Sequence, residues 1–473
     1  MTTKRLSVGC FSILGCLCLT LNPLLAQQEE NAETAKAAEE YKERLEKVDL
    51  DATPEKHKVL ATWCKRNYPD KYEFHLRAYH EYQFKKLESA LPAVPTQEQL
   101  KALITQAEKL ELPDKAGEYR TKWGEAQFAI YQKKLKPGDL KMMQLLLKWA
   151  IDNGVESIDP VRELAGDIVK LDGSDLSAHK VLGHCYVDGE WKTLDELIAG
   201  VNIRDPKERL KLHERLAGGN DSKARTLQPN PTRGMEDDNG LLLASTAASG
   251  GQAKYYLALN NYSKSKPTPL IISLHGGGSG GFEKAKSYAR MGASEFATCK
   301  FKGGCVVLAP IARSHVTNSW GTLSNFEDLL DAMEETRARF NIDMKRIYVT
   351  GQSMGGGGTS LYYLCFPEMA AASCARAGFY FRDGSVRDVL GKPLMVIHGE
   401  KDEAFRTASR DELVKQVKEI KGDLTHISLP DVDHFISSTE VLKNCLPYFE
   451  EHTNDIEPDL RVLRAAGRAY FRN

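Results

Sequence analysis

Short apolar runs separated by helical stretches fill the chain from residue 241 onward, and they restrict its fold more than any other feature. The runs are continuous rather than alternating, which is typical of strands buried on both faces of a parallel sheet. We therefore predict an α/β fold, a mostly parallel sheet with helices on both faces. After an N-terminal hairpin, the predicted strands cover residues 269–274, 305–310, 346–351, 371–377, 393–399 and 425–430.

The chain before residue 217 has a different composition. Glu, Lys, Ala and Leu dominate residues 27–216, and apolar residues recur at spacings of three and four, as on one face of a helix. Pro and Gly interrupt this pattern at intervals typical of helical hairpins. We predict a mainly helical N-terminal domain without an assigned role. Near its end, a short strand–turn–strand is expected around Asp188–Gly189, followed by a helix that starts at Thr193.

Composition also sets the other domain boundaries. Residues 217–240 are rich in Gly, Asn, Asp, Pro and charged residues, which is typical of a linker or a long surface loop. The α/β domain is expected over residues 241–452, and residues 453–473 are expected to form a C-terminal tail.

The first 26 residues are typical of a secretory signal peptide. Lys4 and Arg5 precede a mainly apolar run, and Ala26 is the small residue expected at a cleavage site. We predict a chain that is exported to the periplasm, the cell surface or the medium. The alternative is an uncleaved N-terminal anchor. No other segment is apolar over a length that spans a membrane, so no integral span is expected after signal removal.

Charge and cysteine content exclude several classes of protein. Lys and Arg number 64 against 65 Asp and Glu, and this balance argues against a nucleic-acid-binding protein. The signal segment holds three of the ten cysteines, and the seven that remain form no C-x-x-C pair. We therefore expect no metal and no cofactor. Cys299 and Cys305 are close enough along the chain to be bridged in an oxidising compartment.

The predicted strand at 346–351 leads directly into Gly351-Gln352-Ser353-Met354-Gly355 and then into a helical stretch. A G-x-S-x-G sequence between a strand and a helix predicts a nucleophile elbow, a sharp turn that exposes the serine hydroxyl. The glycines are needed because side chains there would collide with neighbouring backbone. The helix that follows directs its first N–H groups toward an anion formed at the serine.

A serine nucleophile needs a base and an acid, and in this fold they follow the serine along the chain. His434 follows the predicted strand at 425–430 and is the predicted base, with His398, His426 and His452 as the alternatives. Asp402, in the loop after the strand at 393–399, is the predicted acid that orients the imidazole. Glu400 and Asp433 lie nearby and are the alternative acids.

Two further sets of residues are predicted around the serine. The run His275-Gly276-Gly277-Gly278 follows a strand and is expected to supply an oxyanion-hole N–H from Gly276 or Gly277, beside that of Met354. His275 is expected to brace this loop. Aromatic residues that follow strand ends are the candidate substrate pocket, although each alone is as consistent with packing. They are Phe282, Trp320, Phe379, Tyr380 and Phe435.

Residues of about 241–450 resemble the α/β-hydrolase superfamily through RIYVTGQSMGGGGTS, LHGGGSGG and VIHGEKD. The resemblance is to the secreted esterase branch, with poly(3-hydroxybutyrate) depolymerase-like, feruloyl esterase-like and phospholipase/carboxylesterase-like members. It implies hydrolysis of carboxylic esters through an acyl-enzyme, and related branches contain peptidases. The run of glycines at 355–358 is richer than the usual elbow. The resemblance says nothing about the helical N-terminal region.

These observations predict an exported serine hydrolase, a carboxylic ester hydrolase with a Ser353–His434–Asp402 triad. The expected partner is a small-molecule or polymeric ester, and the helical N-terminal domain is a candidate for contact with a protein or polymer. The alternatives are a serine peptidase on the same fold and a non-catalytic binding protein with a hydrolase-like domain. Neither the acyl group nor the alcohol of the substrate follows from the sequence.

Overall fold

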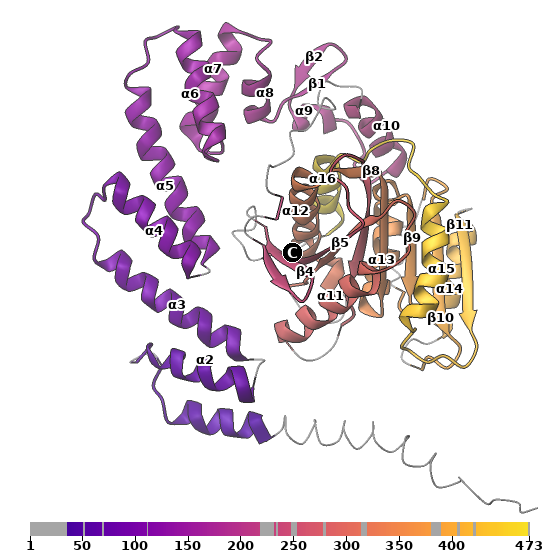
Figure 1. Ribbon diagram of the computed structural model, residues 1–473. Helices are drawn as coiled ribbons and strands as arrows, with labels where there is room; N and C mark the ends of the chain where they lie inside the picture. Colours follow the sequence, from indigo (N-terminus) through magenta and orange to yellow (C-terminus); the bar gives the residue numbers. More distant parts are fainter. Residues whose placement is uncertain are drawn as a thin grey trace, which may run out of the picture. The chain divides into compact units, whose positions relative to one another are not determined.

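The computed structural model (Figure 1) describes most of the chain. The described residues form two compact units, one before Leu91 and one from Leu91 onward. The described residues are 36–50, 53–68, 71–110, 112–217, 231–232, 235–246, 253–277, 281–313, 319–379, 389–403, 407–419 and 422–471. The predicted signal peptide and most of the predicted linker lie outside them. Among the described residues, no helix combines the length and apolar character needed to cross a membrane.

The first unit is helical. Residues 36–46 form a helix, and α2 (Lys56–Asn67) packs against α3 (Tyr72–Ser89). Its interior holds polar rings as well as apolar side chains. The buried His75 lies 2.7 Å from His57 through their Nδ1 atoms, and its Nε2 is 2.9 Å from the Tyr41 hydroxyl.

The second unit begins with helices that follow the predicted three- and four-residue periodicity. Several have side-chain caps at their N-termini, with Thr96, Asp139 and Asp175 each accepting a backbone N–H of the first turn. The buried faces of α6 and α7 meet in one apolar cluster with Phe128 of α5. These helices are α4 (Gln97–Lys109), α5 (Pro113–Gln132), α6 (Leu140–Asp152), α7 (Asp159–Leu171) and α8 (Leu176–Leu182).

A small hairpin follows, as predicted. β1 (Cys185–Val187) and β2 (Glu190–Lys192) pair antiparallel, and a Thr193 capping box starts α9 (Leu194–Ile198). The apolar faces of this hairpin, of α9 and of α10 (Pro206–Ala217) bury one cluster that includes Val462, near the C-terminus. The end of the helical region therefore packs onto the C-terminal part of the chain.

The core of the second unit is a nine-stranded sheet in the order β11-β10-β9-β8-β6-β7-β5-β4-β3. Neighbours from β7 to β11 run parallel, and β5, β4 and β3 continue the sheet antiparallel. The strands are β3 (Glu236–Asp238), β4 (Leu241–Ser245), β5 (Lys254–Asn260), β6 (Thr268–Leu274), β7 (Cys305–Pro310), β8 (Ile342–Gln352), β9 (Ala372–Arg376), β10 (Pro393–Gly399) and β11 (Asp423–Leu429).

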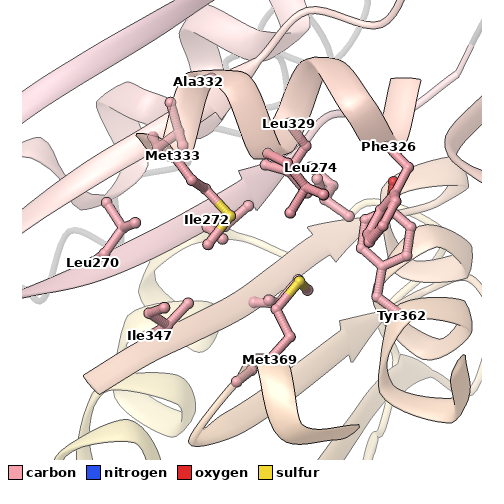
Figure 2. Close-up of a cluster of buried hydrophobic side chains, with 14 of the residues drawn as sticks. Leu270, Ile272, Leu274, Phe326, Leu329, Ala332, Met333, Ile347, Tyr362 and Met369 are labelled. Carbon is pink, nitrogen blue, oxygen red and sulfur yellow. The ribbon is translucent and has the colours of Figure 1, made fainter. Parts of the chain in front are cut away.

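Helices cover both faces of the sheet because alternate residues of the central strands point to opposite sides. Leu270, Ile272 and Leu274 of β6 pack with side chains of α12 and α13, as Figure 2 shows, and the same cluster includes side chains of α16. Ile271 points the other way, into a cluster with α11 and α15. The helical segments of this part are α11 (Gly281–Ala297), η3 (Ser319–Gly321), α12 (Leu323–Arg339), α13 (Met354–Cys365), η4 (Pro367–Met369), α14 (Thr407–Glu419), α15 (Ser438–Glu450) and α16 (Leu460–Tyr470).

This architecture confirms the predicted fold class, a mostly parallel sheet with helices on both faces after a mainly helical region. Two segments differ from what the sequence predicted for them. Residues 453–473, expected to be a tail, contain α16, whose Leu460, Leu463 and Ala466 are buried in the core. A Cβ added at Gly467 would lie 2.5 Å from the Phe326 ring, so α16 packs closely on α12.

The end of the helical region is likewise part of the α/β core. Arg209 of α10 is completely buried and forms an ion pair with Glu368 of η4. Its guanidinium also donates to the carbonyls of Ile203 and Cys365, at 2.9 and 2.7 Å. Residues 206–217 therefore belong structurally with the sheet that follows them.

Candidate active site

Ser353 occupies the sharp turn between β8 and α13, where the motif places it. Its backbone has φ 58° and ψ −120°, a strained conformation for a residue with a side chain. Two backbone hydrogen bonds hold the turn. The Ser353 N–H donates to the Arg376 carbonyl at 2.9 Å, and the Ser353 carbonyl accepts from the Gly357 N–H at 3.0 Å.

Glycine is required around this turn because backbone approaches backbone closely. A Cβ at Gly355 would lie 1.9 Å from the Leu274 carbonyl oxygen, and one at Gly351 would lie 2.5 Å from that of Gly355. At Gly378, after β9, a Cβ would lie 1.8 Å from the Ser353 carbonyl oxygen. At these three glycines, the backbone around the serine turn leaves no room for a Cβ.

The structure brings Ser353, His434 and Asp402 into one hydrogen-bonded chain. Ser353 Oγ lies 2.9 Å from His434 Nε2. His434 Nδ1 lies 2.9 and 3.1 Å from the two carboxylate oxygens of Asp402. The side chain of Asp402 is 3% exposed and that of His434 is 19% exposed, so the carboxylate is shielded while the imidazole reaches solvent.

The alternative bases and acids make other contacts. His398 Nδ1 lies 3.2 Å from His426 Nε2, and the two rings stack. His452 Nδ1 lies 2.6 Å from the Tyr448 carbonyl. Glu400 accepts from the Ser428 hydroxyl, and Asp433 accepts from the Phe435 N–H.

The glycine loop after β6 lies against the serine turn. A Cβ at Gly277 would lie 2.9 Å from the Met354 sulfur, and one at Gly276 would lie 3.4 Å from the Gln352 carbonyl oxygen. The His275 side chain is buried, and its two ring nitrogens hydrogen-bond to the backbone of the loop and of Ala312. Its Nε2 accepts from the Ala312 N–H at 3.0 Å, so its Nδ1 is the donor to the Gly276 carbonyl at 2.7 Å.

The aromatic residues proposed for a pocket lie in different surroundings. Trp320 is 1% exposed, packs beside Gly358, and donates its indole N–H to the His275 carbonyl at 3.1 Å. Phe379 is buried in an apolar cluster with α13 and β10 side chains. Phe282 is half-buried, whereas Phe435, next to the base, is 75% exposed. Tyr380 lies outside the described residues.

Two residues near the serine were not singled out from the sequence. Gln352 donates its side-chain amide to the His434 carbonyl at 2.8 Å. Arg376, whose carbonyl accepts from Ser353, is buried with its guanidinium on the Glu295 carboxylate at 2.8 Å. Burial alone lowers the pKa of Arg376, but the neighbouring Glu295 carboxylate raises it, and the net pKa lies above its ordinary value. The sequence signal that could have identified Arg376 is its position as a charged residue at the end of an otherwise apolar strand.

The arrangement suits nucleophilic chemistry at an acyl carbon. A hydroxyl bonded to an imidazole can transfer its proton as it attacks, and a carboxylate on the far nitrogen stabilises the imidazolium that forms. Within the described ranges, no three His, Cys, Asp or Glu side chains are placed so that they could hold a metal ion.

The strand order and the strand–turn–helix at Ser353 define an α/β-hydrolase fold. No protein-family model matches the chain, and no curated protein is detectably similar to it in sequence. Among solved structures, a thermostable esterase is 25% identical, with a TM-score of 0.35 over 43% of this chain and 59% of that one. The chain thus spans less than two thirds of that esterase.

Two other solved structures have comparable TM-scores. Est1E from Butyrivibrio proteoclasticus is 17% identical, with a TM-score of 0.31 over 46% of this chain and 97% of that one. Esterase 2 from Thermogutta terrifontis is 14% identical, with a TM-score of 0.33 over 42% of this chain and 88% of that one. With TM-scores this low, none of these similarities bears on what the chain binds or cleaves.

Proposed function

We propose that the chain is an exported serine hydrolase that cleaves carboxylic esters. The observation that carries this proposal is the hydrogen-bonded sequence of Ser353, His434 and Asp402. The serine-to-imidazole distance is 2.9 Å, and the imidazole-to-carboxylate distance is also 2.9 Å. The three groups come from separate segments, namely the turn after β8 and the loops after β10 and β11.

In the proposed reaction, Ser353 Oγ attacks the ester carbonyl while His434 Nε2 takes its proton. Asp402 keeps the proton of the neutral imidazole on Nδ1 and stabilises the charged form. The negative charge on the carbonyl oxygen is held by the N–H of Met354, at the start of α13, and by that of Gly276 or Gly277. His434 then protonates the departing alcohol, and a water activated by His434 releases the acid from Ser353.

Labelling with a fluorophosphonate tests the proposal without assuming a substrate. The purified full-length chain is expected to form one adduct, located by mass spectrometry on Ser353. His434→Ala is expected to slow labelling by about 10³-fold or more, because the hydroxyl loses its base. His426→Ala is the matched control, since this exposed histidine contacts His398 instead, and it is expected to label normally.

A folded chain that does not react at Ser353, or that reacts equally well as the His434 variant, would overturn the proposal. A panel of aryl esters, acetylated sugars and peptides then separates the ester hydrolase from a peptidase, which uses the same groups. The helical N-terminal region has no part in this reaction scheme.

The exported state rests on the first 26 residues, with Lys4 and Arg5 before an apolar run. N-terminal sequencing of the protein recovered from producing cells tests it. A mature N-terminus at Gln27 in the periplasm or medium is expected. An intact Met1 on membrane-bound chain indicates the uncleaved anchor, and an intact Met1 on soluble cytosolic chain contradicts export.

A further inference from the structure

Two buried cysteines lie unusually close together behind the candidate site. Cys374 is on β9 and Cys445 is on α15, and their sulfur atoms are 3.0 Å apart. Both side chains have no exposed surface and belong to the same apolar cluster. The two residues are 71 positions apart in sequence, so only the fold brings them together.

The distance is short enough for a covalent bond with a small movement. A disulfide bond is about 2.05 Å long, so the Cys374 and Cys445 sulfurs need to approach by only ~1 Å. Cys299 and Cys305, the pair that the sequence suggested, are 4.0 Å apart and need to approach by about twice that distance. The closer pair is the one that the spacing along the chain does not reveal.

The two cysteines lie on the strand next to Ser353 and on the helix that follows His434 in the chain. Cys374 lies two residues before Arg376, whose carbonyl accepts the Ser353 N–H. Cys445 lies on the helix that begins at Ser438, four residues after His434. A bond between the two sulfurs would tie the strand beside the serine to the helix that follows the base.

We propose that Cys374 and Cys445 form an intramolecular disulfide when the chain meets a small-molecule or protein disulfide. A Cys374 or Cys445 thiolate attacks one sulfur of the donor and releases one donor thiol. The second cysteine thiolate then attacks the mixed disulfide and releases the other. The two cysteines lose two protons and two electrons in total, and the donor disulfide gains them as two thiols. This modification does not depend on the proposed hydrolase activity.

The surroundings predict when the exchange takes place. Burial, together with the neighbouring Cys374, raises the pKa of the Cys445 thiol well above its ordinary value, and Arg376 opposes this only in part. Since the thiolate is the reactive form, the closed core disfavours exchange. The bond therefore forms while the chain folds or opens locally, as in an exported protein that folds in an oxidising compartment.

Peptide mapping of the full-length chain tests the proposal. The chain is oxidised with glutathione disulfide in sub-denaturing urea, its remaining thiols are alkylated, and it is digested with trypsin and a Glu-specific protease. Cleavage after Glu368 separates Cys365 from Cys374. The expected product is residues 369–376 joined to residues 444–450, two hydrogen atoms lighter than the separate reduced peptides.

Stability supplies a second measurement. Closing a 71-residue loop is expected to raise the Tm of the oxidised chain over the dithiothreitol-treated chain by on the order of 10 °C. Cys374→Ala should abolish both the linked peptide and this difference. Cys305→Ala is the matched control, since Cys305 is also a fully buried strand residue, and it should keep both.

Alkylation of both Cys374 and Cys445 in the oxidised wild-type chain would overturn the proposal. So would a peptide map in which Cys374 or Cys445 is linked only to another cysteine. The peptide map of the wild-type chain decides the matter even if the variant does not fold. Loss of fluorophosphonate labelling, by contrast, bears on the proposed hydrolase and leaves this result unaffected.

Discussion

The side-chain amide of Gln352 donates to the backbone carbonyl of His434 at 2.8 Å, so the residue before the serine holds the loop that carries the proposed base. Ser353 is fixed by the backbone of β8 and α13, whereas His434 lies on a loop after β11. A hydrogen bond from Gln352 to that loop fixes the two reacting groups relative to each other. Gln352 is a positioning residue in the proposed mechanism.

Gln352→Ala is therefore expected to slow fluorophosphonate labelling and ester turnover. The net value of such a hydrogen bond is about 1 kcal/mol, which corresponds to roughly a 5-fold change in rate. The loss should appear in kcat, since Gln352 acts through His434. Gln144→Ala is the matched control, because Gln144 donates to Asp175 at the same 2.8 Å but lies on α6. Equal rates for the two variants would contradict the positioning role.

Gly378→Ala tests the close approach of β9 to the serine turn. The added Cβ would lie 1.8 Å from the Ser353 carbonyl oxygen, so either the turn or the strand must move. We expect the free energy of unfolding to fall by about 1–3 kcal/mol and Ser353 labelling to be lost. Thermal melts and labelling at a temperature where the variant is folded measure the two effects.

The control for Gly378 is a glycine with room for a side chain. Gly117 lies within α5, and no atom of another element is within 4 Å of its added Cβ. Gly117→Ala is expected to stabilise the chain by about 0.5–1 kcal/mol because alanine favours the helix. Normal labelling of a folded Gly378→Ala chain would show that the turn tolerates the movement.

Much of the α/β fold was predictable because local patterns specify it. Continuous apolar runs marked the central strands, and the glycines of the motif marked the turn at Ser353. Strand β8 begins at Ile342, earlier than expected, since residues 342–346 alternate in burial and include charged side chains. The aromatic residues were harder to place, because an apolar ring after a strand end can either face solvent, as Phe435 does, or enter the core, as Trp320 does.

The parts that were not predictable depend on distant partners. The segment with α16 looks charged because Arg461, Arg464 and Arg468 occupy its polar face, although its opposite face is apolar. Arg209 looks like a solvated helix residue until Glu368, 159 positions later, is placed against it. Likewise, the Gln352 amide finds its acceptor 82 positions away, and a single sequence carries no record of that contact.

Removing one partner of the buried Arg209–Glu368 pair is expected to be strongly destabilising. Both side chains are almost completely buried, at 0% and 1% exposure. Arg209→Met would leave the Glu368 carboxylate without its main partner, at an expected cost of about 3–5 kcal/mol. The double variant Arg209→Met/Glu368→Met should recover much of this loss, since no unpaired charge remains. Urea denaturation monitored by circular dichroism measures both changes.

Arg215 provides the control on the same helix. It pairs with Asp188 at 2.7 Å, but the two side chains are 40% and 61% exposed. Arg215→Met is therefore expected to cost no more than about 1 kcal/mol. If Arg209→Met is as mild as Arg215→Met, α10 is not anchored on the α/β core in the way that the buried pair indicates.

The first unit is expected to lose stability as the pH falls below about 6.5. Burial, together with His57 and Lys71, lowers the pKa of His75 from 6.5 to about 4. The unfolded chain therefore binds a proton between pH 6.5 and 4 that the folded unit does not. The contribution of His75 to stability is fully present above pH 6.5 and declines as the pH falls toward 4.

Hydrogen exchange of peptides from residues 36–89, corrected for intrinsic rates at pH 7 and pH 5, measures this decline. His75→Asn should remove the pH dependence of the corrected protection, even if the variant is less protected at both pH values. If the pH dependence is unchanged in this variant, a group other than His75 causes it.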